Sequence, residues 1–348
     1  MGVNTGVNTK FGVTMPILNQ EYTTFPKMAK AAEDAGFDSV WDYEFYRNPF
    51  IIHGLTSQVT SRISLATGLA TTINRSPFEM ANAAADIDEL SGGRTILGIG
   101  MGAAGFADIL SGGEYNHPAP RIREYIQAMR AAWKHLDTGE PADFTGKYYS
   151  FAAPPFNPFG RRTIVRQDIP IYVAALRPIM LKLAGEVADG VIGYMMTPKF
   201  VTDMVIPNIT EGARRAGRDP STIDIASETI CSISRDRDEA YRRARIQVGI
   251  YMSYPVSAPL VDIMGLQSER EAVLQALMTK GPDVLQDVVD DKLVDTFSIT
   301  GTPDEARRKV AEYEGKLPHI LLHTPYVPPL AQDESADAFA NIVETFAR

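Results

Sequence analysis

The sequence predicts an α/β fold, a (β/α)8 TIM barrel in which eight parallel strands alternate with helices. Two observations lead to this prediction. Short apolar runs alternate with longer segments whose apolar residues recur at helical spacing. The alternation repeats eight times, which suggests that the sheet closes into a barrel. The length of 348 residues does not decide, because it could make two domains, while barrels of this class routinely exceed about 250 residues as one domain. An open, doubly wound sheet fits the same alternation and is the alternative fold.

The expected strands are short and apolar. They cover residues 11–15, 37–41, 62–69, 95–99, 169–174, 190–194, 223–233 and 319–323. The expected helices cover residues 25–35, 49–59, 77–91, 122–136, 178–188, 199–216 and 335–347. Helices between successive strands return the chain to the same end of the sheet each time, so the strands are expected to pair in parallel.

The third expected helix has the clearest start and stop signals. Ser76-Pro77-Phe78-Glu79 is a capping box with proline at the first helical position. Ser76 is expected to accept a hydrogen bond from the Glu79 amide, while the Glu79 carboxylate reaches back. The helix should end at Gly92-Gly93, where a positive φ is easily adopted. Thr302-Pro303-Asp304-Glu305 repeats the start signal before a later helix.

Three segments depart from the alternation within what we expect to be a single domain, residues 1–348. Residues 1–9 are polar and are expected to form a flexible leader. Residues 137–167 are rich in proline, glycine and aromatic residues, which indicates an excursion at the barrel rim. Residues 236–296 read as helical throughout, with a break at Pro255 to Pro259, and indicate a helical insertion before the last strand.

Charge and composition exclude several classes of function. The net charge of −9 argues against non-specific nucleic-acid binding, which needs a basic face. The single cysteine, Cys231, lies in an apolar run as an inert core thiol and indicates a reducing compartment. No apolar run approaches the ~18 residues that span a bilayer. We therefore expect a cytoplasmic protein that acts on a small molecule, with no nucleic-acid or membrane partner.

A glycine-rich stretch follows the fourth expected strand. Gly100-Met-Gly-Ala-Ala-Gly105 matches the G-x-G-x-x-G dinucleotide motif. A Rossmann site also needs a helix opening in that loop, but Pro118 and Pro120 follow, and Glu124 lies within a helical stripe rather than at a strand end. We therefore interpret the glycines as a tight turn that lets a flat ring approach the backbone.

In a barrel, the functional residues lie where strands end and helices begin. Arg177 precedes one expected helix, and Thr197 and Lys199 begin the next. Helix N-termini bind anions, so these residues are candidates for holding a phosphate group of a cofactor. The alternative is ordinary capping by Thr197 with a solvated Lys199. Arg75 could assist, although a surface arginine before a cap is equally consistent with the sequence.

Acidic residues end the second expected strand. Glu44 lies among aromatic residues and close to Asp42, and both features raise the pKa of a carboxyl group, as proton donation requires. Period-two geometry makes the two side chains point the same way. The alternative for Glu44 is a rim carboxylate in a salt bridge. His323 ends the last expected strand and is a further candidate catalytic residue, although a lone histidine is more often structural.

Other residues near the strand ends have simpler interpretations. Glu114, Tyr115 and His117 lie in the loop after the fourth strand and could form a substrate lid. Trp41 and Met101 read as core or ring-packing residues. No spacing of histidine or cysteine resembles a metal site, so no metal is expected.

Several motifs follow one another along nearly the whole chain. They are Ala66 to Pro77, Asp88-Glu-Leu-Ser-Gly-Gly-Arg94, Leu97 to Gly102, Pro170 to Ala175, Met180 to Gly190, and Phe297 to Glu305. Together they resemble the luciferase-like monooxygenase superfamily, and the Asp-Glu-Leu-Ser-Gly-Gly-Arg run is the most specific. That superfamily is built on a TIM barrel, so the resemblance implies a barrel of the bacterial-luciferase-like type.

Within the superfamily, Ile169 to Ala216 and Val294 to Phe297 look most like the branch that uses the deazaflavin coenzyme F-420, especially methylenetetrahydromethanopterin reductase. The resemblance implies a cis peptide at Gly68-Leu69, in a bulge of the third strand behind the cofactor ring. Two departures from the residues of this branch limit how far its substrate can be assigned to this chain. Thr14 stands where the reductase branch has glutamate, and Glu44-Phe45 stands where many deazaflavin enzymes have Asp-His. We therefore expect a paralogue with another substrate.

The function implied by the resemblance is hydride transfer between F-420 and a small organic substrate. Cofactor contacts are expected from Gly68, Leu69, Ala70, Met101, Ala175, Leu176, Arg177, Thr197 and Lys199. One alternative is an FMN-dependent monooxygenase supplied with reduced flavin by a partner reductase. The other is a barrel that binds flavin without catalysis. The resemblance also implies a homodimer.

Overall fold

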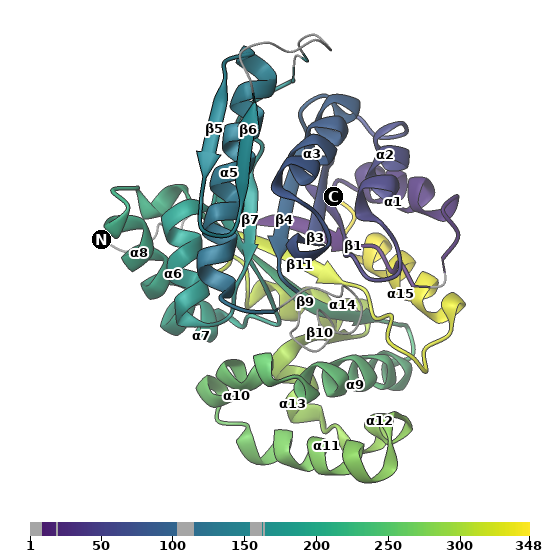
Figure 1. The fold of residues 1–348 in the computed structure, drawn as a ribbon. Coiled ribbons are helices and arrows are strands. Elements are labelled where there is room, and N and C mark those ends of the chain that lie inside the picture. Colours follow the sequence, from purple (N-terminus) through teal and green to yellow (C-terminus); the bar gives the residue numbers. More distant parts are fainter. Residues whose placement is uncertain (1–8, 19, 103–114, 154–161, 163) are drawn as a thin grey trace.

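A computed structural model describes residues 9–18, 20–102, 115–153, 162 and 164–348, and Figure 1 shows a barrel of parallel strands surrounded by helices. The barrel strands are β1 (Lys10–Thr14), β2 (Ser39–Asp42), β3 (Ser64–Thr71), β4 (Thr95–Gly100), β7 (Ile171–Ala174), β8 (Gly190–Tyr194), β9 (Asp224–Ile233) and β11 (His319–His323). They pair in the order β1-β2-β3-β4-β7-β8-β9-β11, and β11 returns to β1. Closure confirms the barrel and excludes the open sheet.

A ninth parallel strand, β10 (Ser298–Gly301), was not predicted from the sequence. It pairs with the second half of β9, from Ile230 to Ile233, whereas β11 and β8 pair with the first half. The strand is only four residues long, has one large apolar residue, Ile299, and follows α13 without a connecting loop, so it has no apolar run of its own that marks a strand. β10 therefore pairs with the end of β9 that continues beyond the closed barrel.

The helices of the outer layer begin close to where the sequence predicts. They are α1 (Thr24–Asp34), α2 (Pro49–Ser57), α3 (Pro77–Ser91), α5 (Pro118–Thr138), α6 (Pro178–Val187), α7 (Pro198–Phe200), α8 (Ile206–Arg215), α14 (Pro303–Ala311) and α15 (Gln332–Thr345). Ser76 accepts from the Glu79 amide at 3.2 Å, but the Glu79 carboxylate pairs with Arg75 instead of reaching back. At Thr302 the other half of the box forms: the Glu305 carboxylate accepts from the Thr302 amide at 2.8 Å and from its hydroxyl at 2.9 Å.

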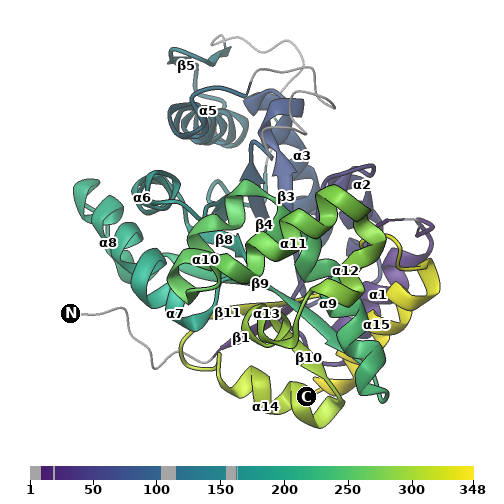
Figure 2. The same cartoon turned by 90° about the horizontal axis from the view of Figure 1, so that it is seen from below.

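The helices α9 (Arg237–Ser253), α10 (Ala258–Met264), α11 (Gln267–Lys280), α12 (Leu285–Val288) and α13 (Asp291–Phe297) occupy the expected insertion. They gather at one end of the barrel in both Figure 1 and Figure 2. Gln247 of α9 donates to the Tyr194 hydroxyl at 3.0 Å, where β8 ends, and accepts from the amide of Tyr326, just after β11. The insertion therefore contacts the carboxyl ends of the strands; β10 and α14 separate it from β11 in the chain.

The rim segment contains an antiparallel hairpin that was not predicted, formed by β5 (Ala142–Thr145) and β6 (Ser150–Ala153). It packs beside α5, and the Phe151 ring stacks on Phe78 of α3 with centroids 5.2 Å apart. The strands are short and partly exposed, so they lack the apolar runs that mark the barrel strands.

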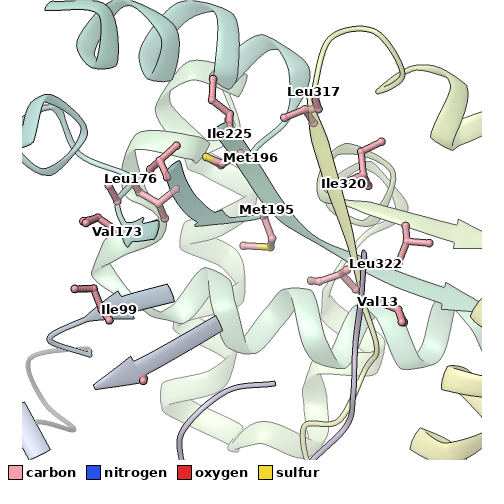
Figure 3. Close-up of a cluster of buried hydrophobic side chains, with 14 of the residues drawn as sticks. Val13, Ile99, Val173, Leu176, Met195, Met196, Ile225, Leu317, Ile320 and Leu322 are labelled. Carbon is pink, nitrogen blue, oxygen red and sulfur yellow. The ribbon is translucent and has the colours of Figure 1, made fainter. Parts of the chain in front are cut away.

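Alternate residues of the barrel strands face two different cores. Figure 3 shows part of the outer core, between strands and helices, where Val13, Ile99 and Leu322 are fully buried. The inner core is a separate cluster formed by Trp41, Ala66, Tyr172, Ile192, Ala226 and Leu321. Side chains two residues further along the strands toward their carboxyl ends also face inward, because strand side chains alternate with period two. That next inner layer lies at the barrel mouth.

Candidate active site

The inner layer at the barrel mouth, called the mouth layer below, is polar. Its members on the strands are Thr14 (β1), Gly68 (β3), Tyr194 (β8), Glu228 (β9) and His323 (β11). His323 Nδ1 lies 3.9 Å from Glu228 Oε1. A Cβ atom added to Gly68 would lie 2.8 Å from the same Glu228 oxygen. The structure therefore brings β3, β9 and β11 together around one carboxyl group.

Several polar atoms of the mouth layer have no partner. Within the described part of the chain, Thr14 Oγ1, Glu228 Oε1 and both ring nitrogens of His323 are buried without a hydrogen bond. Buried polar groups are nearly always hydrogen-bonded, and exceptions concentrate at functional sites. This set of donors and acceptors fits a polar ligand at the mouth.

Burial also sets the charges of the mouth layer. It raises the pKa of Glu228 from 4.5 to about 8 and lowers the pKa of His323 from 6.5 to about 3. Both shifts disfavour the charged form of the side chain. Near neutral pH, Glu228 is therefore a neutral carboxylic acid and His323 a neutral imidazole, so the two side chains do not form an ion pair.

Tyrosine rings surround His323. The rings of Tyr194, Tyr326 and Tyr43 have centroids 5.0, 5.5 and 6.0 Å from its ring. Tyr251 of α9 stacks on Tyr194 at 3.8 Å, and its hydroxyl lies 2.8 Å from that of Tyr326. Burial raises the pKa of all four hydroxyls, so they stay protonated. They supply neutral hydrogen-bonding groups and flat apolar faces.

The third strand bulges beside this layer. The pairing of β3 with β4 shifts between Thr67 and Ala70, and the Gly68-Leu69 peptide is cis, as the resemblance implied. Thr67 Oγ1 donates to the carbonyl of Gly98 on β4 at 2.8 Å. A Cβ atom on Gly98 would lie 2.0 Å from the Thr67 carbonyl oxygen, so the bulge requires glycine there.

Glu44 is tied to the bulge. Its amide donates to the Leu69 carbonyl at 3.0 Å, and its carboxylate accepts from the Thr71 amide at 2.7 Å and from the Arg75 guanidinium at 2.7 Å. Burial alone would raise the pKa of Glu44, but these hydrogen bonds outweigh it and lower that pKa. The expectation of a raised pKa for Glu44 is therefore wrong, and the alternative of a salt bridge at the rim is what the structure contains.

Asp42 faces away from the mouth layer. Its neighbour Trp41 belongs to the inner core, so Asp42 points outward, where its Oδ1 lies 3.1 Å from His53 Nε2 on α2. The same His53 nitrogen lies 3.0 Å from the Ala66 carbonyl oxygen. Burial raises the pKa of Asp42, against the opposing effect of His53. The sequence-based placement of Asp42 among the groups at the mouth is therefore wrong.

The residues expected to contact a cofactor lie at strand ends. Ala70, Met101, Ala175 and Leu176 are buried, and Gly68 and Leu69 are half-buried. Arg177 is exposed, and it donates to the Pro255 carbonyl at 2.9 Å. Thr197 caps α7 by accepting from the Phe200 amide at 3.1 Å, and the exposed Lys199 pairs with Asp203. These last two contacts match the capping alternative.

The expected lid is only partly within the described residues. Tyr115 is half-buried; burial raises the pKa of its hydroxyl, and the nearby Arg177 opposes that shift. His117 precedes α5 with a φ of 47°. Glu114 and residues 103–105 of the glycine-rich stretch lie outside the described residues. Cys231 is buried in the outer core, as expected for an inert thiol.

Sequence reasoning missed Glu228; it placed Tyr43 and Tyr194 at strand ends but gave the tyrosine side chains no role. All residues of β9 from Ile225 to Ile233 are buried, and Glu228 is the only charged residue among them. A charge inside an otherwise uncharged strand is costly to bury unless it is paired or neutral. That signal could have identified Glu228. Gln247 carries no such signal, because it lies on a helix with charged and apolar residues on all sides.

Two broader features complete the description. In the part of the chain that the structure describes, no group of three or more histidine, cysteine, aspartate or glutamate side chains is placed to hold a metal ion. No described helix is long and apolar enough to cross a membrane.

The fold and the mouth layer define a (β/α)8 barrel whose unpaired polar groups gather at the carboxyl ends of the strands, where barrel enzymes bind their ligands. The chain belongs to the luciferase-like monooxygenase family, whose model matches residues 3–319.

Known relatives refine this placement. The chain is 32% identical over 319 residues to 5,10-methylenetetrahydromethanopterin reductase of Methanopyrus kandleri, with 87% of this chain and 88% of that protein covered. The reductase of Methanolobus tindarius is 33% identical, with coverage of 82% and 84%. The structure of the F-420-dependent tetrahydromethanopterin reductase from Methanopyrus kandleri matches with a TM-score of 0.80 at 28% identity, over 97% of this chain and 98% of that one.

Proposed function

We propose that this protein is an oxidoreductase that uses coenzyme F-420 and transfers hydride to or from a small organic substrate at the barrel mouth. One observation carries the proposal: the unpaired Oε1 of the neutral Glu228 lies against Gly68 in the bulge, and the unpaired ring of the neutral His323 lies 3.9 Å from that oxygen. Reductases that use F-420 are among the relatives of the chain. An enzyme that moves hydride needs such a buried site, because bulk water would compete for the reacting groups.

The residues present fit a flat ring. On the side of β3, β4 and β7, the inward positions near the mouth are Gly68, Gly100 and Ala174, which carry little or no side chain. A Cβ atom on Gly68 would lie 2.8 Å from Glu228 Oε1, and one on Gly100 would lie 3.0 Å from the Leu69 side chain, so protein atoms fill the space inside this layer. A flat ring would therefore lie on top of the layer, at the open end of the barrel, with the bulge, Glu228 and His323 beneath it. When bound, the deazaflavin supplies the hydride, and carbon in place of the flavin nitrogen prevents oxygen activation.

The remaining expected contacts hold the cofactor in this proposal. Gly68, Leu69, Ala70, Met101, Ala175 and Leu176 line the ring, and the start of α6 at Arg177, with Thr197 and Lys199, holds the phosphate group. Lys199 would exchange its exposed partner Asp203 for the ligand. Glu44 fixes the bulge rather than donating a proton, since its pKa is lowered.

Side-by-side calorimetric titration of the cofactor-free protein with F-420 and with FMN tests the proposal. We expect binding of F-420 with a clear preference over FMN. Preference for FMN, together with oxygen consumption on addition of reduced flavin, would favour the monooxygenase function of the family instead. Binding of neither cofactor would overturn the proposal. Light scattering on the same sample would test the homodimer that the resemblance implies.

A further inference from the structure

We propose that Glu228 is the acid that gives the substrate its proton when hydride reaches the substrate carbon, and that takes the proton back in the opposite direction. This inference rests on the proposed function and assigns the proton chemistry of that site to one residue. Neither Glu44 nor Asp42, the acids that the sequence favoured, has the surroundings for that role.

The position of Glu228 is the first argument. Its side chain is 10% exposed, and it extends from β9 into the mouth layer toward Gly68, the residue at the centre of the bulge. Oε1 is buried and has no hydrogen-bond partner within the described residues. Because Oε1 is packed against Gly68, the exposed tenth of the side chain is the part of Glu228 that a substrate at the barrel mouth would contact.

The groups that face Glu228 are the second argument. They are His323 of β11, Tyr194 of β8, Tyr251 of α9, and Tyr43 and Tyr326 of the segments after β2 and β11. All are uncharged near neutral pH, because burial lowers the pKa of His323 and raises those of the tyrosines. No cation among the described residues is placed to ionise Glu228. Its pKa is accordingly raised to about 8 by burial.

Other acids of the barrel provide the contrast. Asp224 lies four residues before Glu228 on β9, two inward positions closer to the amino end of the strand. It contacts Lys10 at 3.2 Å and accepts from the Tyr172 hydroxyl at 2.6 Å. Despite its burial, the His319 and Lys10 side chains lower the pKa of Asp224. Glu44 is ionised beside Arg75. An ionised carboxylate has no proton to donate, so Glu228 is the acid suited to the role.

The proton and electron balance is simple for a substrate with a carbon–oxygen or carbon–nitrogen double bond. A hydride from the reduced cofactor forms a carbon–hydrogen bond, and the π electron pair moves to the heteroatom. The heteroatom takes the proton from the Glu228 carboxyl, whose O–H bond breaks. The substrate is reduced by two electrons and the cofactor is oxidised; the proton that the cofactor releases restores the one Glu228 gave.

Infrared spectroscopy tests the state of Glu228 without turnover. The carbonyl stretch of a protonated carboxyl should be present in the wild-type protein at pH 7 and disappear with a midpoint near pH 8. The component that titrates near pH 8 should be absent in Glu228→Gln and retained in Glu44→Gln, the matched control with an ionised carboxylate. Asp42, whose pKa burial also raises, is the other source of such a band, and Glu228→Gln leaves that source in place. Adding F-420 should shift the Glu228 component. A component near pH 8 that survives in Glu228→Gln, or that F-420 does not shift, would overturn the inference.

Turnover gives the second test. Because Thr14 and Glu44 depart from the residues of the F-420 branch, the probe is whichever compound the wild type reduces with F-420, chosen from small ketones, imines and 5,10-methylenetetrahydromethanopterin, the substrate named for the relatives. Glu228→Gln should bind F-420 as the wild type does but reduce the probe about 100-fold or more slowly, the usual range for a lost general acid. Wild-type turnover by Glu228→Gln would overturn the inference while leaving the proposed function intact. Failure of the wild type to bind F-420 would instead refute the proposed function.

Discussion

His323 Nδ1 lies 3.9 Å from Glu228 Oε1, and four residues earlier on the same two strands His319 Nδ1 lies 3.6 Å from Asp224 Oδ2. The pKa of the carboxyl group is shifted in opposite directions in the two pairs. Burial raises the pKa of Glu228, whereas charged and hydrogen-bonding neighbours lower that of Asp224. The lower pair lies toward the amino ends of the strands, where barrels are stabilised, and the upper pair at the mouth, where they bind ligands.

The pH dependence of stability should reveal the neutral Glu228. Its pKa is about 8 when folded and near 4.5 when unfolded, so between these values the folded protein holds a proton that the unfolded chain has lost. Protonation of Glu228 therefore stabilises the folded protein fully below pH 4.5, and this stabilisation is lost as the pH rises to 8. At ~1.4 kcal/mol per pKa unit, the free energy of unfolding falls by at most about 5 kcal/mol over that range. Urea unfolding from pH 5 to 9 should show this decline in wild type.

Glu228→Gln should remove that decline, because the amide does not titrate. His323 acts in a different range: its folded pKa of about 3 is below its ordinary 6.5, so its stabilising effect is present above pH 6.5 and lost toward pH 3. Glu44→Gln is the control, since its lowered pKa leaves the range from pH 5 to 9 unaffected. An equal decline in wild type and Glu228→Gln would contradict a neutral Glu228.

Removal of Arg75 should loosen the bulge. The side chains of Arg75 and Glu44 are 9% and 10% exposed, so Arg75→Ala leaves a nearly buried carboxylate without its cation. Breaking such a pair costs about 3–5 kcal/mol. Chemical denaturation should show this loss, and it should shrink in the double variant with Glu44→Gln. Lys134→Ala, which removes an exposed pair with Glu140, is the control and should cost less than about 1 kcal/mol.

Gly98→Ala should disrupt the bulge directly. The added Cβ would lie 2.0 Å from the Thr67 carbonyl oxygen, a backbone atom that cannot move without shifting β3. We expect a destabilisation of about 1–3 kcal/mol from overpacking and weaker F-420 binding in calorimetry. Gly54→Ala on α2 is the matched control, because its Cβ would meet only Ile87 at 3.8 Å and alanine favours the helix. Unchanged F-420 affinity in Gly98→Ala would show that the bulge does not contribute to the cofactor site.

Much of the fold follows from sequence pattern, because each barrel strand is a short apolar run bounded by helix caps such as Ser76 and Gly92. The strand β10 and the rim hairpin escaped prediction because one merges with a helix and the other is partly exposed. The candidate site was harder. Glu44 and Asp42 looked alike in sequence, but one meets Arg75 and the other His53. Long-range contacts decide which carboxyl stays neutral, and local pattern does not contain them.

The helical insertion should matter for the site through Gln247. Its side chain is fully buried; its Nε2 donates to Tyr194, and its Oε1 accepts from the amides of Tyr326 and Val327 at 3.2 Å. Gln247→Met keeps the volume but leaves those groups unpaired, at a cost of about 1–3 kcal/mol. Without Gln247, Tyr194 and Tyr326, whose rings lie beside His323, each lose a hydrogen bond that orients them, so we expect substrate binding to weaken more than F-420 binding.

Gln275→Met provides the control, because Gln275 is exposed on α11 of the same insertion. Denaturation and calorimetry on the two variants separate a general effect of the insertion from the specific bridge at the mouth. One outcome is that Gln247→Met lowers stability and leaves both the pH titration of the Glu228 carboxyl and the KM for the probe unchanged. In that case the insertion would stabilise the barrel without contributing to the substrate site. A raised KM confined to Gln247→Met would make α9 a wall of the substrate site, since Gln247 orients the tyrosine rings that enclose His323.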